Sequence, residues 1–153
     1  SHLLLKHILQ LQGRMRCMTK AVTSEDQLAA AWRDLSIRYN KVLCSLDREL
    51  QAKHGLSSSE FEVLELLAEA DDHQARMSEL ASRVHLSQSA LSRVVGRLEK
   101  DGLVVRTMCS SDRRSVFATL TASGEQRYAQ ARPTQRETLA SLTDGCPQLL
   151  REG

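Results

Sequence analysis

A short stretch near the middle of the chain carries polar side chains at a spacing suited to binding an extended surface. Between residues 86 and 98, apolar residues recur every three or four positions, which is typical of a helix with one buried face. The opposite face carries small, amide or guanidinium side chains: Gln88, Ser89, Ser92, Arg93, Gly96 and Arg97. None is acidic, and such groups can hydrogen-bond to base edges or to phosphates. For Ser89 and Ser92, an ordinary solvent-exposed helix surface is the alternative.

The segments around this helix determine how its polar face is presented. Ser87 is a favourable N-cap, and Gly102 suits the left-handed position that ends a helix. A short amphipathic segment at residues 77–84 lies just before the cap, which predicts a helix-turn-helix whose second helix enters the DNA major groove. Two stretches rich in β-branched residues, 103–107 and 116–120, predict strands joined by a polar, basic loop. Such a hairpin is typical of a wing that reaches the minor groove or flanking phosphates.

This part of the chain resembles the winged-helix core of the MarR family of bacterial transcriptional regulators. The matching residues are 77–81, 86–104, 112–115 and the Leu-Thr-x-x-Gly pattern at 120–124, which follow one another at the family's spacing. The resemblance implies that Asp112 pairs with and orients Arg114, which can then insert into the minor groove. Arg113 and Arg97 would add phosphate contacts. A solvent-exposed loop arginine is the alternative for Arg114.

The resemblance also implies a homodimer on a palindromic or near-palindromic operator, with recognition helices about 34 Å apart. Family members commonly release DNA when a small aromatic or phenolic ligand binds between the DNA lobe and the dimer lobe, or when a cysteine is oxidised. We therefore expect a sequence-specific regulator of transcription that binds double-stranded DNA and acts as a repressor, without a cofactor. A winged helix used only for protein contacts is the alternative; the basic helix face and wing argue against it.

The sequence predicts a mainly α-helical fold with a small β-hairpin. Residues 24–55 and 121–153 are expected to form a helical dimerisation lobe, and residues 56–120 the winged helix-turn-helix lobe. The first long helix has Ser24 as its cap and an apolar stripe that runs almost to Gly55. Pro133 is expected to kink or break the helix that Thr121 caps. Only residues 148–153 then remain for the last helix of the family pattern.

Residues 1–17 fit the family pattern poorly, and two interpretations stay open. Ser1-His2 is typical of the remnant that a protease leaves when it removes an expression tag, with Met15 or Met18 as the natural first residue. Alternatively, the segment is an extra amphipathic helix that packs on a partner and supplies apolar surface missing at the other end of the chain.

Charge is distributed unevenly along the 153-residue chain, whose formal net charge is only +2. Residues 76–114 hold eight Lys or Arg against four Asp or Glu. Positive charge is therefore concentrated on the predicted DNA-reading unit, as expected for a nucleic-acid partner. Residues 60–72 hold six acidic residues and no Lys or Arg. DNA would repel that surface, so it should face away from phosphates or pair with basic residues of the same fold.

The four cysteines and five histidines have no spacing typical of a zinc site. Cys44 lies one position from the apolar stripe of the first long helix and is expected in the core. Cys17, near three basic residues, and Cys109, in the wing, are candidate redox thiols; an ordinary, insensitive cysteine is the alternative for each. No apolar run approaches the roughly 20 residues of a membrane span. Since a secretory signal is not expected either, we expect a cytoplasmic protein.

The sequence carries no recognisable catalytic signature. Gly-x-Ser-x-Gly, a phosphate loop and His-Glu-x-x-His are all absent. The histidines fall in predicted loops, turns or terminal segments. An enzyme is therefore not expected.

Overall fold

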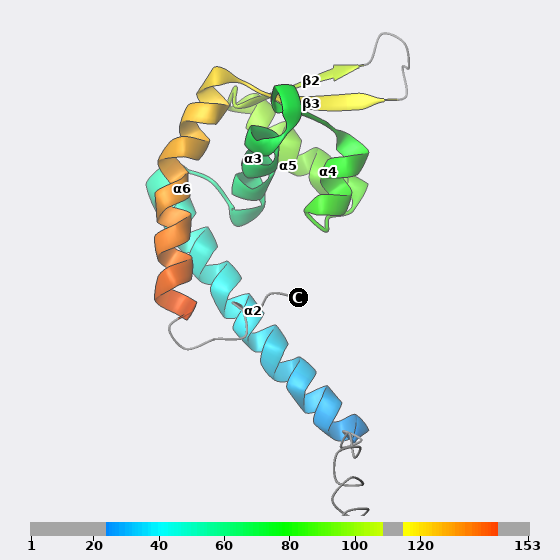
Figure 1. Ribbon diagram of the computed structural model, residues 1–153, viewed down its shortest axis with the longest axis vertical. Helices are drawn as coiled ribbons and strands as arrows, with labels where there is room; N and C mark the ends of the chain where they lie inside the picture. Colours follow the sequence, from blue (N-terminus) through cyan, green and yellow to red (C-terminus); the bar gives the residue numbers. More distant parts are fainter. Residues whose placement is uncertain (1–23, 109–114, 144–153) are drawn as a thin grey trace, which may run out of the picture. The chain divides into compact units, whose positions relative to one another are not determined.

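The structure, a computed structural model, describes residues 24–108 and 115–143, and the predictions for residues 1–17 fall outside this part. The chain divides into two units, Ser1–Arg38 and Tyr39–Gly153. Its elements (Figure 1) are α2 (Glu25–His54), α3 (Ser58–Glu69), a 3-10 turn η2 (Asp71–His73), β1 (Gln74–Arg76), α4 (Met77–Arg83), α5 (Gln88–Lys100), β2 (Val104–Met108), β3 (Val116–Leu120) and α6 (Ala122–Thr143). The fold is mainly α-helical, as predicted.

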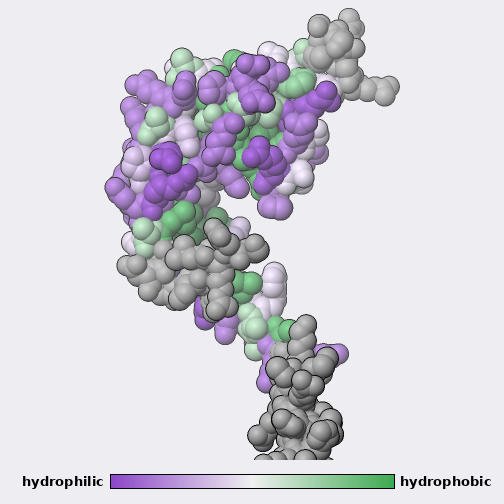
Figure 2. Space-filling view, in the orientation of Figure 1, coloured by the Kyte–Doolittle hydropathy of each residue, from purple (hydrophilic) through white to green (hydrophobic). Residues whose placement is uncertain are grey.

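The long helix α2 begins and ends at the predicted residues. The Ser24 hydroxyl accepts the Gln27 N–H at 3.1 Å, and the Gln27 side chain accepts the Ser24 N–H at 2.9 Å, which is a reciprocal cap. Gly55 has a φ of 66°, the left-handed conformation that ends a helix. Hydrophobic residues show along α2 on the face drawn in Figure 2. The prediction that Cys44 lies in the core was wrong: Cys44 is exposed, because the buried face of α2 is limited to Leu46 and Leu50.

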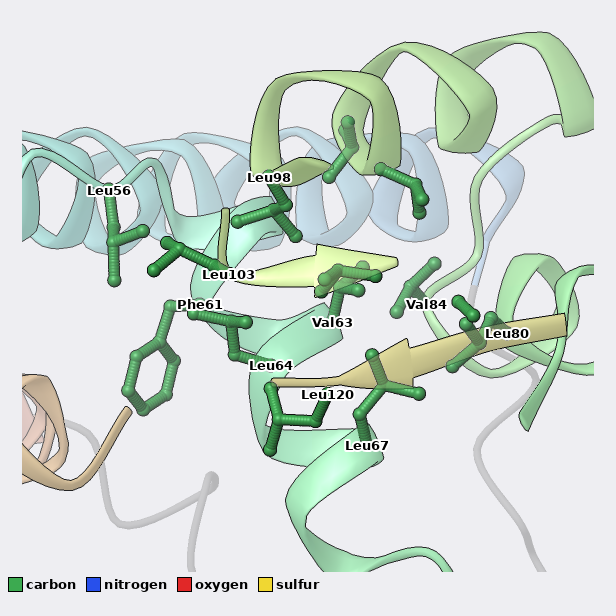
Figure 3. Packing of buried hydrophobic residues seen from close by; sticks show 14 of the residues in the cluster. Leu56, Phe61, Val63, Leu64, Leu67, Leu80, Val84, Leu98, Leu103 and Leu120 are labelled. Atoms are coloured by element: carbon green, nitrogen blue, oxygen red, sulfur yellow. The ribbon is translucent and has the colours of Figure 1, made fainter. Parts of the chain in front are cut away.

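The core of the second unit lies among α3, α4, α5 and the sheet. Val63, Leu98 and Leu120 come from three different elements, and their side chains point into the same interior (Figure 3). Nearly all the buried core residues are aliphatic, as the low aromatic content predicts. Burying such a side chain contributes about 2 kcal/mol. This core fixes α5 in place from one side and leaves its other side free for contacts.

The sheet has three antiparallel strands in the order β1-β3-β2. The predicted hairpin is β2 and β3, with Arg106 opposite Ala118 in the register. The sequence prediction was incomplete here, because it gave only two strands and none at residues 74–76, where β1 lies. β1 pairs with the other side of β3, so that Ala75 also lies opposite Ala118. A strand of three residues is too short to show an alternating pattern.

The predicted break at Pro133 does not occur, because α6 is one helix from Ala122 to Thr143. Pro133 is exposed, whereas Ala131 and Thr134 on either side of it are buried. The Thr134 hydroxyl lies 2.8 Å from His54 Nε2. This contact with α2 holds α6 in place next to Pro133, which has no backbone N–H to donate within the helix.

At the start of α6, a Cβ on Gly124 would lie 2.0 Å from the Leu103 carbonyl oxygen. Only glycine permits this close approach between α6 and the backbone that directly precedes β2.

Candidate nucleic-acid interface

The recognition helix α5 is held by a cap at one end and a glycine at the other. The Ser87 hydroxyl accepts the Ala90 N–H at 3.2 Å, as the sequence predicts. At the other end Gly102 has a φ of 72°, and its N–H and that of Leu103 bond to the carbonyls of Glu99 and Leu98. This is a Schellman motif, and it directs the chain straight into β2. Four residues of α5 face the core: Leu91, Val94, Val95 and Leu98.

The first half of α5 presents polar side chains to solvent. Gln88, Ser89, Ser92 and Arg93 are all exposed. Ser89 Oγ lies 3.2 Å from Ser87 Oγ, so the cap also positions this hydroxyl. Within residues 24–108 and 115–143, the side chains of Gln88 and Arg93 form no hydrogen bond or ion pair. An amide and a guanidinium without internal partners are available to bind an external group.

The second half of α5 is tied to the rest of the fold. Arg97 Nε donates to Glu60 Oε1 at 2.7 Å, and Glu60 is buried at the start of α3. The other carboxylate oxygen of Glu60 accepts the Ser57 N–H at 2.8 Å, which completes a capping box at the start of α3. The Arg97 side chain is 61% exposed, so its terminal N–H groups still reach solvent. A phosphate contact by Arg97 therefore stays a prediction, and Arg97 would make that contact while it also holds its salt bridge to Glu60.

A second salt bridge, between Arg106 and Glu99, was not predicted from the sequence. From β2, the Arg106 guanidinium binds Glu99 Oε2 through Nε at 3.0 Å and Nη2 at 2.9 Å. Its Nη1 donates to Ser92 Oγ at 3.3 Å. These contacts hold the pKa of the Glu99 carboxyl below its ordinary value, mainly through the side-chain hydrogen bond. The available signal was the helical spacing, since Glu99 follows Ser92 by seven residues and shares its face.

The wing is described only at its stem. β2 and β3 pair from Val104–Leu120 to Met108–Val116. Asp112, Arg113, Arg114 and Cys109 lie in the segment between the strands, outside the described residues, as does Cys17. Their predicted roles therefore stay predictions. At the other edge of the sheet, the Arg76 guanidinium lies 5.4 Å from the centroid of the Phe117 ring, a cation–π contact between β1 and β3.

The acidic stretch at residues 60–72 is partly neutralised inside the fold, one of the two arrangements that the sequence analysis expected. Glu60 pairs with Arg97, and Glu65 pairs with Arg136 of α6. The Tyr128 hydroxyl also donates to Glu65, at 3.3 Å. Burial raises the pKa of the Tyr128 phenol, and the negative charge of Glu65 adds to the rise.

Neither a metal site nor a membrane-spanning helix is found in the described part of the chain. Within it, no group of three or more His, Cys, Asp or Glu side chains is arranged to hold a metal ion. None of the helices described is both long enough and apolar enough to cross a bilayer.

The helix-turn-helix, the adjoining hairpin and the polar face of α5 together define a winged helix-turn-helix protein. The model of the MarR family matches residues 56–116. PapX, an HTH-type transcriptional regulator of Escherichia coli, is 31% identical over 73% of this chain and 71% of its own length. The transcriptional repressor YetL of Bacillus subtilis is 32% identical over 72% of this chain and 64% of its own, so the match spans less than two thirds of YetL.

Among solved structures, the fold is similar to that of Sco3205 from Streptomyces coelicolor, a MarR family transcriptional regulator crystallised in complex with DNA. The two chains are 34% identical, with a TM-score of 0.73 over 80% of this chain and 79% of Sco3205. This chain belongs to the MarR family. The relatives are transcriptional regulators and not enzymes, which confirms both the predicted family and the predicted absence of a catalytic role.

Proposed function

We propose that the protein is a sequence-specific transcriptional regulator that represses by binding a palindromic operator in double-stranded DNA as a homodimer. The observation that carries this proposal is the exposed first half of α5. There, the amide of Gln88 and the guanidinium of Arg93 have no partner within residues 24–108 and 115–143. The similarity to Sco3205, which was crystallised with DNA, supports it.

The proposed DNA contacts divide between two grooves. Gln88, Ser89, Ser92 and Arg93 contact base edges or groups near them in the major groove, because their side chains are exposed at the start of α5. Arg97 contacts a phosphate through its exposed N–H groups. In the wing, Asp112 orients Arg114 in the minor groove and Arg113 binds a phosphate, a proposal that rests on the family resemblance.

The proposed homodimer forms through the long helix α2. Leu28, Trp32 and Leu35 follow one another at the three-and-four spacing of one helix face, and each is more than half exposed. Exposed large apolar side chains grouped on one face are typical of a surface that another protein covers. The same surface explains why so long a helix is useful in a small protein. Analytical ultracentrifugation of Trp32→Glu, with the exposed Gln27→Glu as a matched control, tests this: only Trp32→Glu should yield monomers.

An effector that releases the protein from DNA completes the proposal. A groove of about 410 Å³ is lined by residues from the end of α2, the start of α3 and the end of α5; its charged residues are Glu60, Arg97, Lys100 and Asp101. Arg97 in this groove is already paired with Glu60, so we expect the carboxylate of an aromatic acid, or a phenolate, to pair with Lys100 at the end of the recognition helix. Titrating aromatic acids and phenols against a preformed DNA complex tests the proposal. A compound that releases DNA from the parent chain should release it less well from Lys100→Ala.

Thiol oxidation is the second proposed release mechanism, with Cys17 and Cys109 as the candidate thiols. Oxidation of Cys109 would disturb the wing loop that we expect to contact DNA. Operator binding measured before peroxide, after peroxide and again after reductant tests this. Unchanged binding throughout would eliminate thiol sensing.

The competing function is a winged helix that binds only proteins. The experiment that separates the two is a gel shift with the DNA upstream of the protein's own gene, against a scrambled duplex of equal length. We expect a preference for the upstream DNA and a footprint of two half-sites separated by about one helical turn. Equal binding of both duplexes at several salt concentrations would contradict the proposed function.

A further inference from the structure

The contacts of Arg106 join the wing stem to the recognition helix. Its guanidinium lies along one stripe of α5, formed by Ser92, Gly96 and Glu99 at intervals of four and three residues. Nη1 reaches Ser92 and Nη2 reaches Glu99. Between them, Nη2 passes 3.9 Å from the point where a Cβ on Gly96 would lie. The contacts of this one guanidinium therefore span almost two turns of α5, beginning at Ser92, one of the predicted DNA contacts.

The backbone of Arg106 takes part as well. Among the described strands, whose order is β1-β3-β2, β2 lies at one edge of the sheet and pairs only with β3. The Arg106 N–H donates to Glu99 Oε1 at 3.3 Å, while Nε and Nη2 bind the other oxygen of the same carboxylate. A single carboxylate thus satisfies both the strand backbone and the side chain of Arg106. This arrangement fixes the position of β2 against α5 independently of the hydrophobic core.

We propose that Arg106 is a positioning residue for DNA binding, which with Glu99 locks the wing to the recognition helix so that the two elements meet DNA at one fixed spacing. The inference rests on the proposed function. It gives a specific role to Ser92, whose hydroxyl accepts from Arg106 and keeps its own O–H free to donate to DNA. Arg106 thereby selects the orientation in which Ser92 faces a base.

A direct phosphate contact by Arg106 is the rival explanation, and the two predict opposite effects of Glu99→Gln. If Arg106 bound a phosphate, removing its internal counter-charge would strengthen binding to any DNA. If Arg106 positions the wing, the same change loosens the tie and weakens binding to the operator only. Arg106→Lys separates them again: lysine keeps the positive charge but cannot hold Glu99 and Ser92 together.

The test measures the affinity of the full chain for its own upstream DNA and for a scrambled duplex, by fluorescence anisotropy across a salt series. The variants are Arg106→Ala, Arg106→Lys and Glu99→Gln. Glu79→Gln is the matched control, because Glu79 is an exposed acid on α4 whose side chain forms no ion pair or hydrogen bond within the described residues, and the change removes the same charge. Hydroxyl-radical footprints report the wing separately from the helix.

We expect Arg106→Ala and Glu99→Gln each to lower operator affinity about tenfold, the size of effect that losing a charged hydrogen bond produces. Affinity for the scrambled duplex should stay within about twofold, and protection at the wing should weaken before protection in the major groove. Arg106→Lys should fall between the parent and Arg106→Ala. Circular dichroism verifies that each variant is folded. Arg106→Lys and Glu99→Gln are the mildest changes, so they keep the test interpretable if Arg106→Ala does not fold.

The outcomes distinguish the two proposals. If the parent chain prefers its upstream DNA and Glu99→Gln binds it as tightly or more tightly, the positioning role is overturned and the proposed function stands. If Arg106→Lys binds like the parent, the positioning role is likewise overturned. If the parent shows no preference for its upstream DNA, the proposed function fails and this inference with it.

Discussion

The two halves of the recognition helix look alike in composition and differ in their surroundings. Both present arginines on the outward face of α5. In the first half, Arg93 is exposed and has no side-chain partner in the described part of the chain. In the second half, Arg97 is bound to Glu60 and the charge of Glu99 is bound to Arg106. The comparison suggests a division within one helix: the first half is available to DNA, and the second half fixes the helix to α3 and the wing stem.

The largest effect that tests this division is expected for Arg93→Ala. The change should lower operator affinity by about 2 kcal/mol, roughly thirtyfold, since a well-placed bidentate base contact contributes that much discrimination. The melting temperature should not move, because Arg93 has no internal partner among the described residues. Anisotropy titration and circular dichroism measure the two quantities. Arg97→Ala is the comparison variant, and a larger loss of affinity there than in Arg93→Ala would contradict the division.

Glu60→Gln is expected to have a smaller effect, and one on stability: it should lower the free energy of unfolding and leave operator affinity unchanged. Both carboxylate oxygens of Glu60 accept hydrogen bonds, one from Arg97 and one from the Ser57 N–H, and an amide supplies only one acceptor. We expect the free energy of unfolding to fall by about 1.5 kcal/mol, the cost of leaving a buried group unsatisfied. Denaturant titration measures it. Operator affinity of the folded variant should not fall; an unchanged unfolding free energy would show that Glu60 does not hold the second half of α5.

Gly96→Ala should produce a still smaller change, with a stabilising sign. The added Cβ meets Arg106 at 3.9 Å, an ordinary van der Waals distance, so the tie to Glu99 remains intact. Alanine in a helix interior is favoured over glycine, and we expect the free energy of unfolding to rise by about 0.7 kcal/mol. A loss of stability on denaturant titration would mean that Arg106 needs the space above Gly96.

The smallest effect concerns pH. The pKa of Glu99 is held below its ordinary value of 4.5, so its ionised form favours the folded state. That contribution is fully present above the unfolded-state pKa and is lost as pH falls through the lower folded-state pKa. The melting temperature of the parent should therefore exceed that of Glu99→Gln at neutral pH, and the gap should narrow only below about pH 4.5. If the difference in melting temperature narrowed already between pH 6 and pH 5, a group other than the Glu99 carboxyl would be responsible for it.

Local signals in the sequence predicted much of the fold correctly. Caps at Ser24, Ser57 and Ser87 work through hydrogen bonds to residues three positions away, so short motifs reveal them. Gly55 and Gly102 end helices for the same local reason. The MarR resemblance was confirmed because it rests on several such motifs in a fixed order.

The misses arose where distant residues decide the outcome. Pro133 was expected to kink or break a helix; the break does not occur, and Ala131 and Thr134 on either side of Pro133 are buried. β1 exists because β3 has a free edge to pair with, and three residues carry no periodic signal. Arg97 acquired a partner 37 positions away in the sequence. The roles of Arg93, of Arg114 and of the candidate thiols stay predictions, because they concern molecules other than this chain.

The junction around Gly124 has a further consequence. Thr121 donates from its hydroxyl to the Gly102 carbonyl and from its backbone to the Leu103 carbonyl, while Gly124 allows α6 to lie directly on that backbone. The start of α6, the end of α5 and Leu103, which directly precedes β2, are thus joined by hydrogen bonds and direct contact. A movement of the start of α6 would therefore reach the hairpin through contacts to the backbone of residues 102 and 103, which do not involve the side chains of the aliphatic core.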